Sequence, residues 1–222
     1  MDTKRLTLFA GHYGSGKTNI AVNYALHLAK EGKKVCIADL DIVNPYFRTK
    51  DSERELAAAG IRLISPQFAN SNVDLPALPA ESYSLVQDKS TYGIMDIGGD
   101  DRGAYALGRY AGAIRAENDY RMAFVVNCYR PLTATVEDAI EILREIEAAA
   151  GLSFTCIVNN SNVGPETTPE ILLESVGFAE ELSSRTGLPI WMHTAEASVA
   201  AKISGLTVLP MTLQKKIFDL PD

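Results

Sequence analysis

The sequence lacks the features of several large classes of protein. It has no apolar run near the roughly 18–20 residues that a membrane span requires, and its start lacks the apolar core of a signal peptide. Basic residues are in the minority, with 21 Lys and Arg against 28 Asp and Glu, which argues against nonspecific wrapping of nucleic acid. We therefore expect a cytoplasmic protein with no membrane span and no direct contact with nucleic acid.

Cysteine is also scarce. Cys36, Cys128 and Cys156 are far apart, no two of them form C-x-x-C, and each lies in an apolar, strand-like run. Thiols in such runs are usually buried and reduced. The sequence also has no cluster of His, Cys and Asp with the spacing of a metal site, so these cysteines are predicted to be structural.

What the sequence does contain is an alternation of β-rich runs and amphipathic segments. Several runs are continuously apolar, as is typical of parallel strands covered on both faces. Strands are expected at residues 6–10, 34–38, 61–65, 92–96, 122–127, 154–159, 190–193 and 206–209, and helices at 18–31, 135–150 and 169–185. The pattern predicts an α/β fold, a three-layer, doubly wound and mostly parallel sheet, in a single domain over residues 1–222.

Two further segments are defined by composition. Residues 65–81 carry Pro66, Pro76 and Pro79, and are expected to form a long surface loop of the kind that often has a function. Residues 212–220 have an apolar side beside Lys215 and Lys216. That segment is short for a membrane-binding helix, so we expect it to dock on the sheet.

The strongest motif lies between the first strand and the first helix. Gly11-His12-Tyr13-Gly14-Ser15-Gly16-Lys17-Thr18 matches G-x-x-x-x-G-K-[ST], the P-loop, in which glycines let backbone N–H groups point at phosphate oxygens. Lys17 would reach the β- and γ-phosphates, and Thr18 would offer its hydroxyl to Mg²⁺. The predicted nucleotide contacts are Gly11, His12, Tyr13, Gly14, Ser15, Gly16, Lys17, Thr18 and Asn19.

Carboxylates end two of the expected strands. Asp39 and Asp41 follow the second strand, and Asp96 ends the fourth, before the glycines Gly98 and Gly99. A P-loop enzyme needs such carboxylates to hold Mg²⁺ and water, although an Asp at a strand end is often only a turn or cap residue. The combination with the P-loop favours the functional interpretation.

With these motifs the chain resembles the CobQ/CobB/MinD/ParA nucleotide-binding family, within the SIMIBI class of P-loop NTPases. The segment 35–45 is similar to its switch I region, residues 95–99 to its Walker B strand and switch II, and residues 156–160 to its base-reading strand. The segment around residues 188–209 resembles its last strand and closing helix. The resemblance implies that Asp41 positions the attacking water, that Asp39 and Asp96 support Mg²⁺ with Thr18, and that Asn159 or Asn160 reads the adenine.

One departure concerns the phosphate loop. The resemblance leads us to expect a first lysine that reaches across a dimer to the partner's phosphates, but His12 stands at that position. A histidine is mostly neutral at pH 7, so it supplies no permanent charge. Arg48, Arg102 or Arg109, which lie near the switch segments in sequence, are candidates for a substitute cation, against the alternative that they are solvated surface residues.

The resemblance favours a Mg²⁺-dependent ATP-binding switch with slow hydrolysis, catalysed by Lys17 and Asp41, a protein partner, and a nucleotide-dependent homodimer as its mode of assembly. Its cofactors would be ATP and Mg²⁺. A ligase that phosphorylates a small carboxylic acid, like dethiobiotin synthetase or the cobyrinate amidases, is a second interpretation, disfavoured because the loop lacks the threonines of that synthetase. A metallochaperone-like GTPase is a third, disfavoured by the absence of a His-rich or paired-Cys site.

Overall fold

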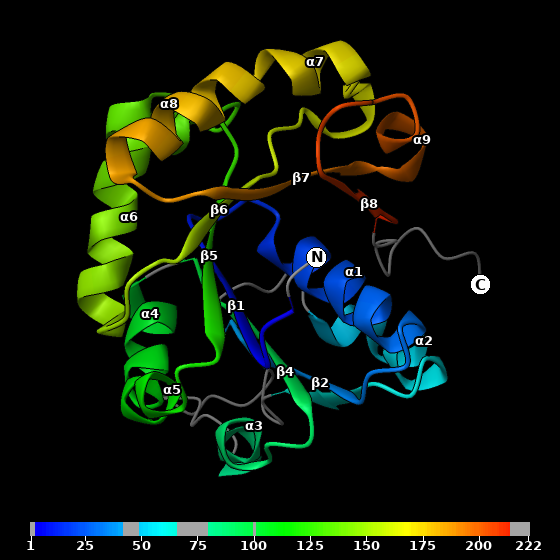
Figure 1. The fold of residues 1–222 in the computed structure, drawn as a ribbon, viewed down its shortest axis with the longest axis vertical. Helices are drawn as coiled ribbons and strands as arrows, with labels where there is room; N and C mark the ends of the chain where they lie inside the picture. Colours follow the sequence, from blue (N-terminus) through cyan, green and yellow to red (C-terminus); the bar gives the residue numbers. More distant parts are fainter. Residues whose placement is uncertain (1–2, 42–48, 66–79, 100, 214–222) are drawn as a thin grey trace, which may run out of the picture.

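The structure is a computed structural model that describes residues 3–41, 49–65, 80–99 and 101–213. These residues form one eight-stranded sheet in which all neighbouring strands are parallel, in the order β3-β2-β4-β1-β5-β6-β7-β8 (Figure 1). The strands are β1 Leu6–Ala10, β2 Val35–Leu40, β3 Arg62–Ile64, β4 Tyr92–Ile97, β5 Tyr120–Val126, β6 Cys156–Asn159, β7 Ile190–Glu196 and β8 Val208–Met211. Every strand that the sequence predicts is present, with ends that differ by a few residues.

The first strand lies in the middle of the sheet, between β4 and β5. All five of its residues are buried, because helices cover both of its faces. The chain leaves β1 toward β2 on one side and later returns to β5 on the other, so the strand order reverses at β1. Open α/β sheets bind ligands outside the carboxyl ends of their strands at such a reversal.

Helices cover both faces of the sheet, which makes the predicted three-layer, doubly wound architecture (Figure 1). Leu28 of α1 and Leu56 of α2 pack in the apolar cluster on one face, and Leu107 of α4 and Leu143 of α6 pack in the cluster on the other. The helices are α1 Lys17–Lys30, α2 Glu53–Ala58, α3 Ser84–Gln87, α4 Asp101–Gly108, α5 Ala111–Glu117, α6 Val136–Ala150, α7 Pro169–Glu174, α8 Val176–Thr186 and α9 Ala197–Ala200.

The prediction of one long helix at residues 169–185 was wrong in one respect. The structure divides this segment at Ser175 into two helices, α7 and α8. The Ser175 hydroxyl donates to the carbonyl oxygen of Leu172 (2.7 Å), and a serine that bonds to its own backbone in this way competes with the helical pattern. The predicted closing helix after β7 is also short: α9 is followed by strand β8.

The remaining predictions about the fold concern the cysteines, the loop at residues 65–81, the C-terminal segment and membrane spans. Cys36 and Cys156 are buried free thiols as expected, but the free thiol of Cys128 follows β5 rather than lying in it and is half-buried. Most of the predicted loop at 65–81 and of the C-terminal segment lies outside the described residues. Among the residues that are described, no helix has both the length and the apolar character needed to cross a bilayer.

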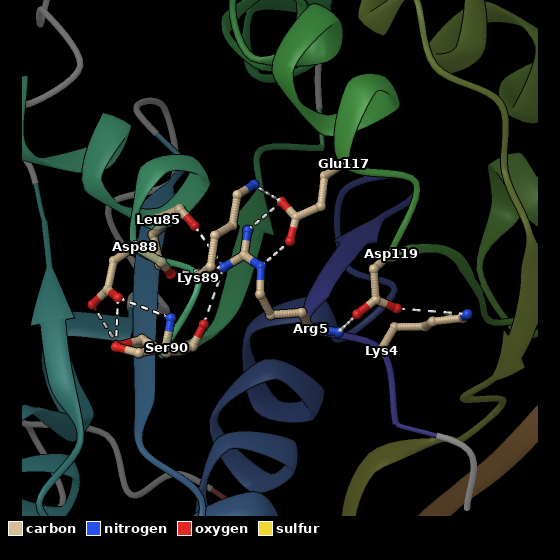
Figure 2. A network of polar contacts seen from close by, with 9 residues as sticks. Lys4, Arg5, Leu85, Asp88, Lys89, Ser90, Glu117 and Asp119 are labelled. Atoms are coloured by element: carbon tan, nitrogen blue, oxygen red, sulfur yellow. Dashed lines mark hydrogen bonds and ion pairs between the residues drawn. The ribbon is translucent and has the colours of Figure 1, made fainter.

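The amino end of the sheet is closed by a network around Arg5, which is 7% exposed (Figure 2). Its guanidinium forms an ion pair with Glu117 at the end of α5 and donates to the carbonyl oxygens of Leu85 (2.9 Å) and Thr91 (3.0 Å). Lys89 also contacts Glu117, at 2.6 Å. Burial opposes ionisation of Glu117, but the hydrogen bonds from Arg5 and Lys89 lower its pKa. The network therefore joins the start of β1 to α3, β4 and α5.

Candidate functional site

The loop between β1 and α1 turns tightly at the carboxyl edge of the sheet. A β-carbon on Gly11 would lie 2.2 Å from the carbonyl oxygen of Val125, and one on Gly16 would lie 2.2 Å from the Nδ2 of Asn160. Gly16 also has a φ of +89°, which side chains disfavour. Only glycine fits these two positions, so the loop can approach β5 and β6 closely. The N–H groups that open helix α1 follow directly after this loop.

The side chains that end the loop are buried within it. Lys17 and Thr18 are only 5% and 8% exposed. The Nζ of Lys17 donates to the carbonyl oxygen of His12 at 3.1 Å, so the lysine folds back over its own loop. The hydroxyl of Ser15 is buried with no hydrogen-bond partner. The loop thus holds a cation and an unused hydroxyl beside its backbone N–H groups, which is the chemistry that phosphate binding requires.

Asp96 lies next to Thr18, near the end of β4, and is 1% exposed. Its Oδ2 accepts a hydrogen bond from the Thr49 hydroxyl (3.0 Å), whereas its Oδ1 has no partner. Burial raises the pKa of this carboxyl to about 6, Thr18 and Lys17 oppose the rise, and Asp41 adds to it. A buried carboxylate oxygen without a partner fits a nearby cation.

Asp39 and Asp41 lie on the neighbouring strand and are also buried, at 2% and 6% exposure. Asp39 is in register with Asp96, because β2 pairs with β4. The Oδ1 of Asp39 accepts from the backbone N–H of Asp41 at 3.0 Å, which fixes the turn after the strand. The two acids named by the sequence therefore stand beside Asp96, at the same edge as the phosphate loop.

The glycines after β4 bring the three loops together. A β-carbon on Gly98 would lie 3.3 Å from the Oδ1 of Asp41. One on Gly99 would lie 2.6 Å from the backbone nitrogen of Tyr13 and 2.9 Å from the Nζ of Lys17. The segment after β4 thus packs against both the phosphate loop and the segment after β2. A change in any of the three must be accommodated by the other two.

The residues of this edge can hold Mg²⁺ without a metal cluster of their own. Among the described residues, no group of three or more His, Cys, Asp and Glu side chains is placed to hold a metal ion. Mg²⁺ is usually bound by one or two carboxylates together with waters and substrate phosphates. The hydroxyl of Thr18 and the carboxylate of Asp96 meet that description.

The two asparagines predicted to read a base are both buried and both engaged. Asn159 donates to the Ser175 hydroxyl (2.9 Å) and contacts the Nδ1 of His193 (3.1 Å). Asn160 donates to the carbonyl oxygen of Ser15 at 2.6 Å and accepts from the Thr194 hydroxyl at 2.5 Å. Asn160 is thus tied to the phosphate loop itself, and its amide supports that loop.

The remaining residues predicted at the site are His12, Tyr13, Asn19 and the candidate arginines. The ring of His12 turns back on its own loop, with its Nδ1 3.0 Å from the carbonyl oxygen of Tyr13, and Tyr13 is 53% exposed. Asn19 lies on α1, half-buried. Of the candidate substitute cations, Arg109 is exposed at the end of α4, while Arg48 and the side chain of Arg102 lie outside the described residues.

Sequence reasoning missed two residues of this edge. Thr49 contacts Asp96, and the Nε of Arg130 lies 3.9 Å from the position that a β-carbon on Gly14 would take. Nothing near Thr49 in the sequence marks it. Arg130 does have a signal, because it follows the carboxyl end of a central strand, where the loops of a parallel sheet carry the site.

Comparison with a family model gives a match over residues 6–163 to the CobQ/CobB/MinD/ParA nucleotide binding domain. This range includes the phosphate loop, Asp96 and both asparagines. No curated protein sequence matches the chain.

Solved structures of low identity share its fold. The cell division protein FtsY from Thermotoga maritima superposes with a TM-score of 0.60 at 16% identity, over 87% of this chain and 62% of that one. The Signal Recognition Particle 54 kDa protein from Aeropyrum pernix, in complex with GDP, gives a TM-score of 0.58 at 18% identity, over 86% and 41%. FtsY from Elizabethkingia anophelis with GDP gives 0.57 at 15%, over 87% and 58%. The chain therefore spans about two fifths to three fifths of these longer proteins.

Proposed function

Because the chain belongs to the CobQ/CobB/MinD/ParA nucleotide-binding family, we propose that it is a Mg²⁺-dependent nucleotide switch that binds and slowly hydrolyses ATP. One observation carries this proposal: the phosphate loop, the segment after β2 and the segment after β4 meet around a buried carboxylate oxygen with no partner. Such an arrangement gives a bound γ-phosphate access to two loops whose positions can report its presence.

Each residue has a defined task in this proposal. Lys17 and the backbone N–H groups of the loop bind the phosphates, and Thr18 and Asp96 hold Mg²⁺, with Asp39 beside them. Bound Mg²⁺ would neutralise the charge that develops on the phosphates. Asp41 orients the attacking water. Catalysis would then come mainly from positioning and charge, as phosphoryl transfer requires little covalent participation by the protein.

The residues after β6 favour adenine over guanine. Guanine presents N–H donors at its pairing edge, and a carboxylate is the natural acceptor for them. The segment that follows β6 offers the amides Asn159, Asn160 and Asn162, and the first acid after them is Glu166. An amide carries both a donor and an acceptor, which matches the edge of adenine. Because the side-chain amides of Asn159, Asn160 and Asn162 are all engaged within the protein, the backbone N–H and C=O groups of this segment would make that contact.

A guanine nucleotide is the second candidate. It is favoured by the fold alone, since two of the similar structures are complexes with GDP. A protein partner and a cytoplasmic location are further parts of the proposal, because a switch needs something to signal to. A dimer with nucleotide between two copies is its expected form of assembly.

Isothermal titration with ATP, ADP and GTP, with and without Mg²⁺, tests the proposal, together with light scattering of the eluted protein. We expect Mg²⁺-dependent binding that prefers ATP. A preference for GTP would favour a guanine nucleotide over ATP as the ligand. Binding of neither nucleotide would overturn both candidates. If ATP is hydrolysed only when a small carboxylic acid is added, the chain is a ligase and the proposal of a nucleotide switch is wrong.

A further inference from the structure

We infer that Arg130 is a phosphate-binding residue of this site, supplying from within the same chain the second cation that His12 does not supply. The inference rests on the proposed nucleotide binding and adds a residue to it. It starts from the position of the Arg130 guanidinium, whose Nε lies 3.9 Å from where a β-carbon on Gly14 would stand. Gly14 is in the middle of the phosphate loop and has a φ of +77°. With only hydrogen on its α-carbon, Gly14 leaves the arginine next to the loop backbone.

The turn that carries Arg130 is built from buried contacts. Asn127, which is 0% exposed, accepts at its carbonyl oxygen from the backbone N–H of Arg130 (3.1 Å) and from the Thr133 hydroxyl (2.7 Å). Its side-chain oxygen accepts from the N–H of Tyr129 at 3.0 Å, and its Nδ2 donates to the carbonyl oxygen of Asn162 at 3.1 Å. The backbone of Arg130 is therefore fixed at the edge of the sheet before any ligand arrives, which lowers the entropy cost of binding.

The charge of Arg130 is also available. Its side chain is exposed, and no acidic side chain that the structure describes forms an ion pair with it. An exposed arginine elsewhere on this chain behaves differently, since Arg185 contacts Glu137 and Glu181. A guanidinium presents several donors in one plane and suits two phosphate oxygens at once. Arg130 thus combines a fixed backbone, a free charge and a place beside the phosphate loop.

This placement has a consequence for assembly. A lysine at position 12 would be expected to serve the phosphates of a second subunit, whereas Arg130 lies beside the loop of its own chain. One copy would then hold both Lys17 and Arg130 near the phosphates. A nucleoside triphosphate should therefore bind measurably to the monomer, before any dimer forms.

Titration of Mg²⁺ with ATP, GTP and ADP into the full chain and its variants tests the inference. In Arg130→Ala we expect triphosphate affinity to fall about tenfold or more, because a charged hydrogen-bonding partner is lost, and diphosphate affinity to fall less. Arg130→Lys should recover part of the loss, and Arg130→Glu should bind more weakly than Arg130→Ala. Arg144→Ala, an exposed arginine of α6, is the matched control and should bind like the wild type.

The outcomes separate the two proposals. If the wild type binds a triphosphate and Arg130→Ala binds it equally well, Arg130 plays no part and the proposed function stands. If Arg130→Ala and Arg144→Ala lose affinity to the same extent, the effect is one of general surface charge and the inference is wrong. If the wild type binds no nucleotide, the proposed function fails and the inference fails with it. A wild-type protein that binds no triphosphate at concentrations where light scattering shows only monomer would overturn the single-chain arrangement.

Discussion

The two ends of the β-sheet use buried polar groups in opposite ways. At the amino end, Arg5 directs its guanidinium to a buried carboxylate and to backbone carbonyls, so that charge and donors are matched within the chain. At the carboxyl end, Asp96 Oδ1 and Ser15 Oγ are buried without partners, and the pKa of Asp96 is raised. A buried carboxylate oxygen without a partner costs stability, so Asp96 marks the carboxyl end as the place for a ligand.

The largest effect is expected from Lys17→Ala, which removes the cation of the phosphate loop. Nucleotide affinity should fall by about a hundredfold or more, because the lost contact is charge-assisted and buried. Stability should change little, which circular dichroism during heating would show. Lys30→Ala, an exposed lysine at the other end of α1, should leave the affinity measured by titration unchanged. Equal nucleotide affinity of Lys17→Ala and the wild type would show that the carboxyl end of the sheet is not the nucleotide site.

A substitution at the amino end of the sheet should lower stability and leave nucleotide affinity unchanged. Arg5→Ala leaves the carboxylate of Glu117, which is 7% exposed, with Lys89 alone, and we expect about 2–4 kcal/mol of lost stability. Nucleotide affinity of the folded protein should be unchanged. Denaturant unfolding of Arg5→Ala, Glu117→Gln and the double variant measures the coupling between the two residues. Additive losses would show that the ion pair contributes nothing beyond its separate parts.

Asp96 should give the carboxyl end a distinctive pH dependence. Its pKa is raised from 3.8 to about 6, so between these values the folded state keeps a proton that the unfolded state has released. Its contribution to stability is therefore full at low pH and is lost as the pH rises through this window, by about 1–3 kcal/mol.

Unfolding in chelator between pH 4.5 and 7 would measure this effect. Asp96→Asn should be more stable than the wild type at pH 7, and its advantage should shrink as the pH falls. Glu145→Gln, at an exposed acid of α6, should follow the wild type. A constant difference between Asp96→Asn and the wild type across the range would contradict the raised pKa.

The smallest effect is expected from the amide that supports the phosphate loop. Asn160→Ala loses the hydrogen bonds to Ser15 and Thr194, and we expect nucleotide affinity to fall about fivefold, by roughly 1 kcal/mol. The loss should be equal for ATP, ADP and GTP if Asn160 acts through the loop. A loss confined to ATP, measured by titration, would instead assign Asn160 to the base.

The fold could be predicted from the sequence because several of its strands are nearly continuous apolar runs and polar or glycine residues separate them from the helices. The meeting of Asp39, Asp41 and Asp96 with the phosphate loop also followed from strand ends sharing one edge. What could not be predicted depended on contacts distant in sequence. The break at Ser175 arises from its own hydroxyl and from Asn159, and the place of Arg130 depends on a turn around Asn127.

The central position of β1 determines when the site can form during synthesis. Leu6 pairs with Gly93 on one side and with Tyr120 on the other, so β1 has no neighbour until β4 has been made and lacks its second neighbour until β5 has followed. Asn160 reaches Ser15 across 145 positions. Such long-range pairing makes folding slow and leaves an apolar strand open to wrong contacts in the meantime. The phosphate loop is therefore made long before Asn160, and it acquires its final shape only after that residue has been made.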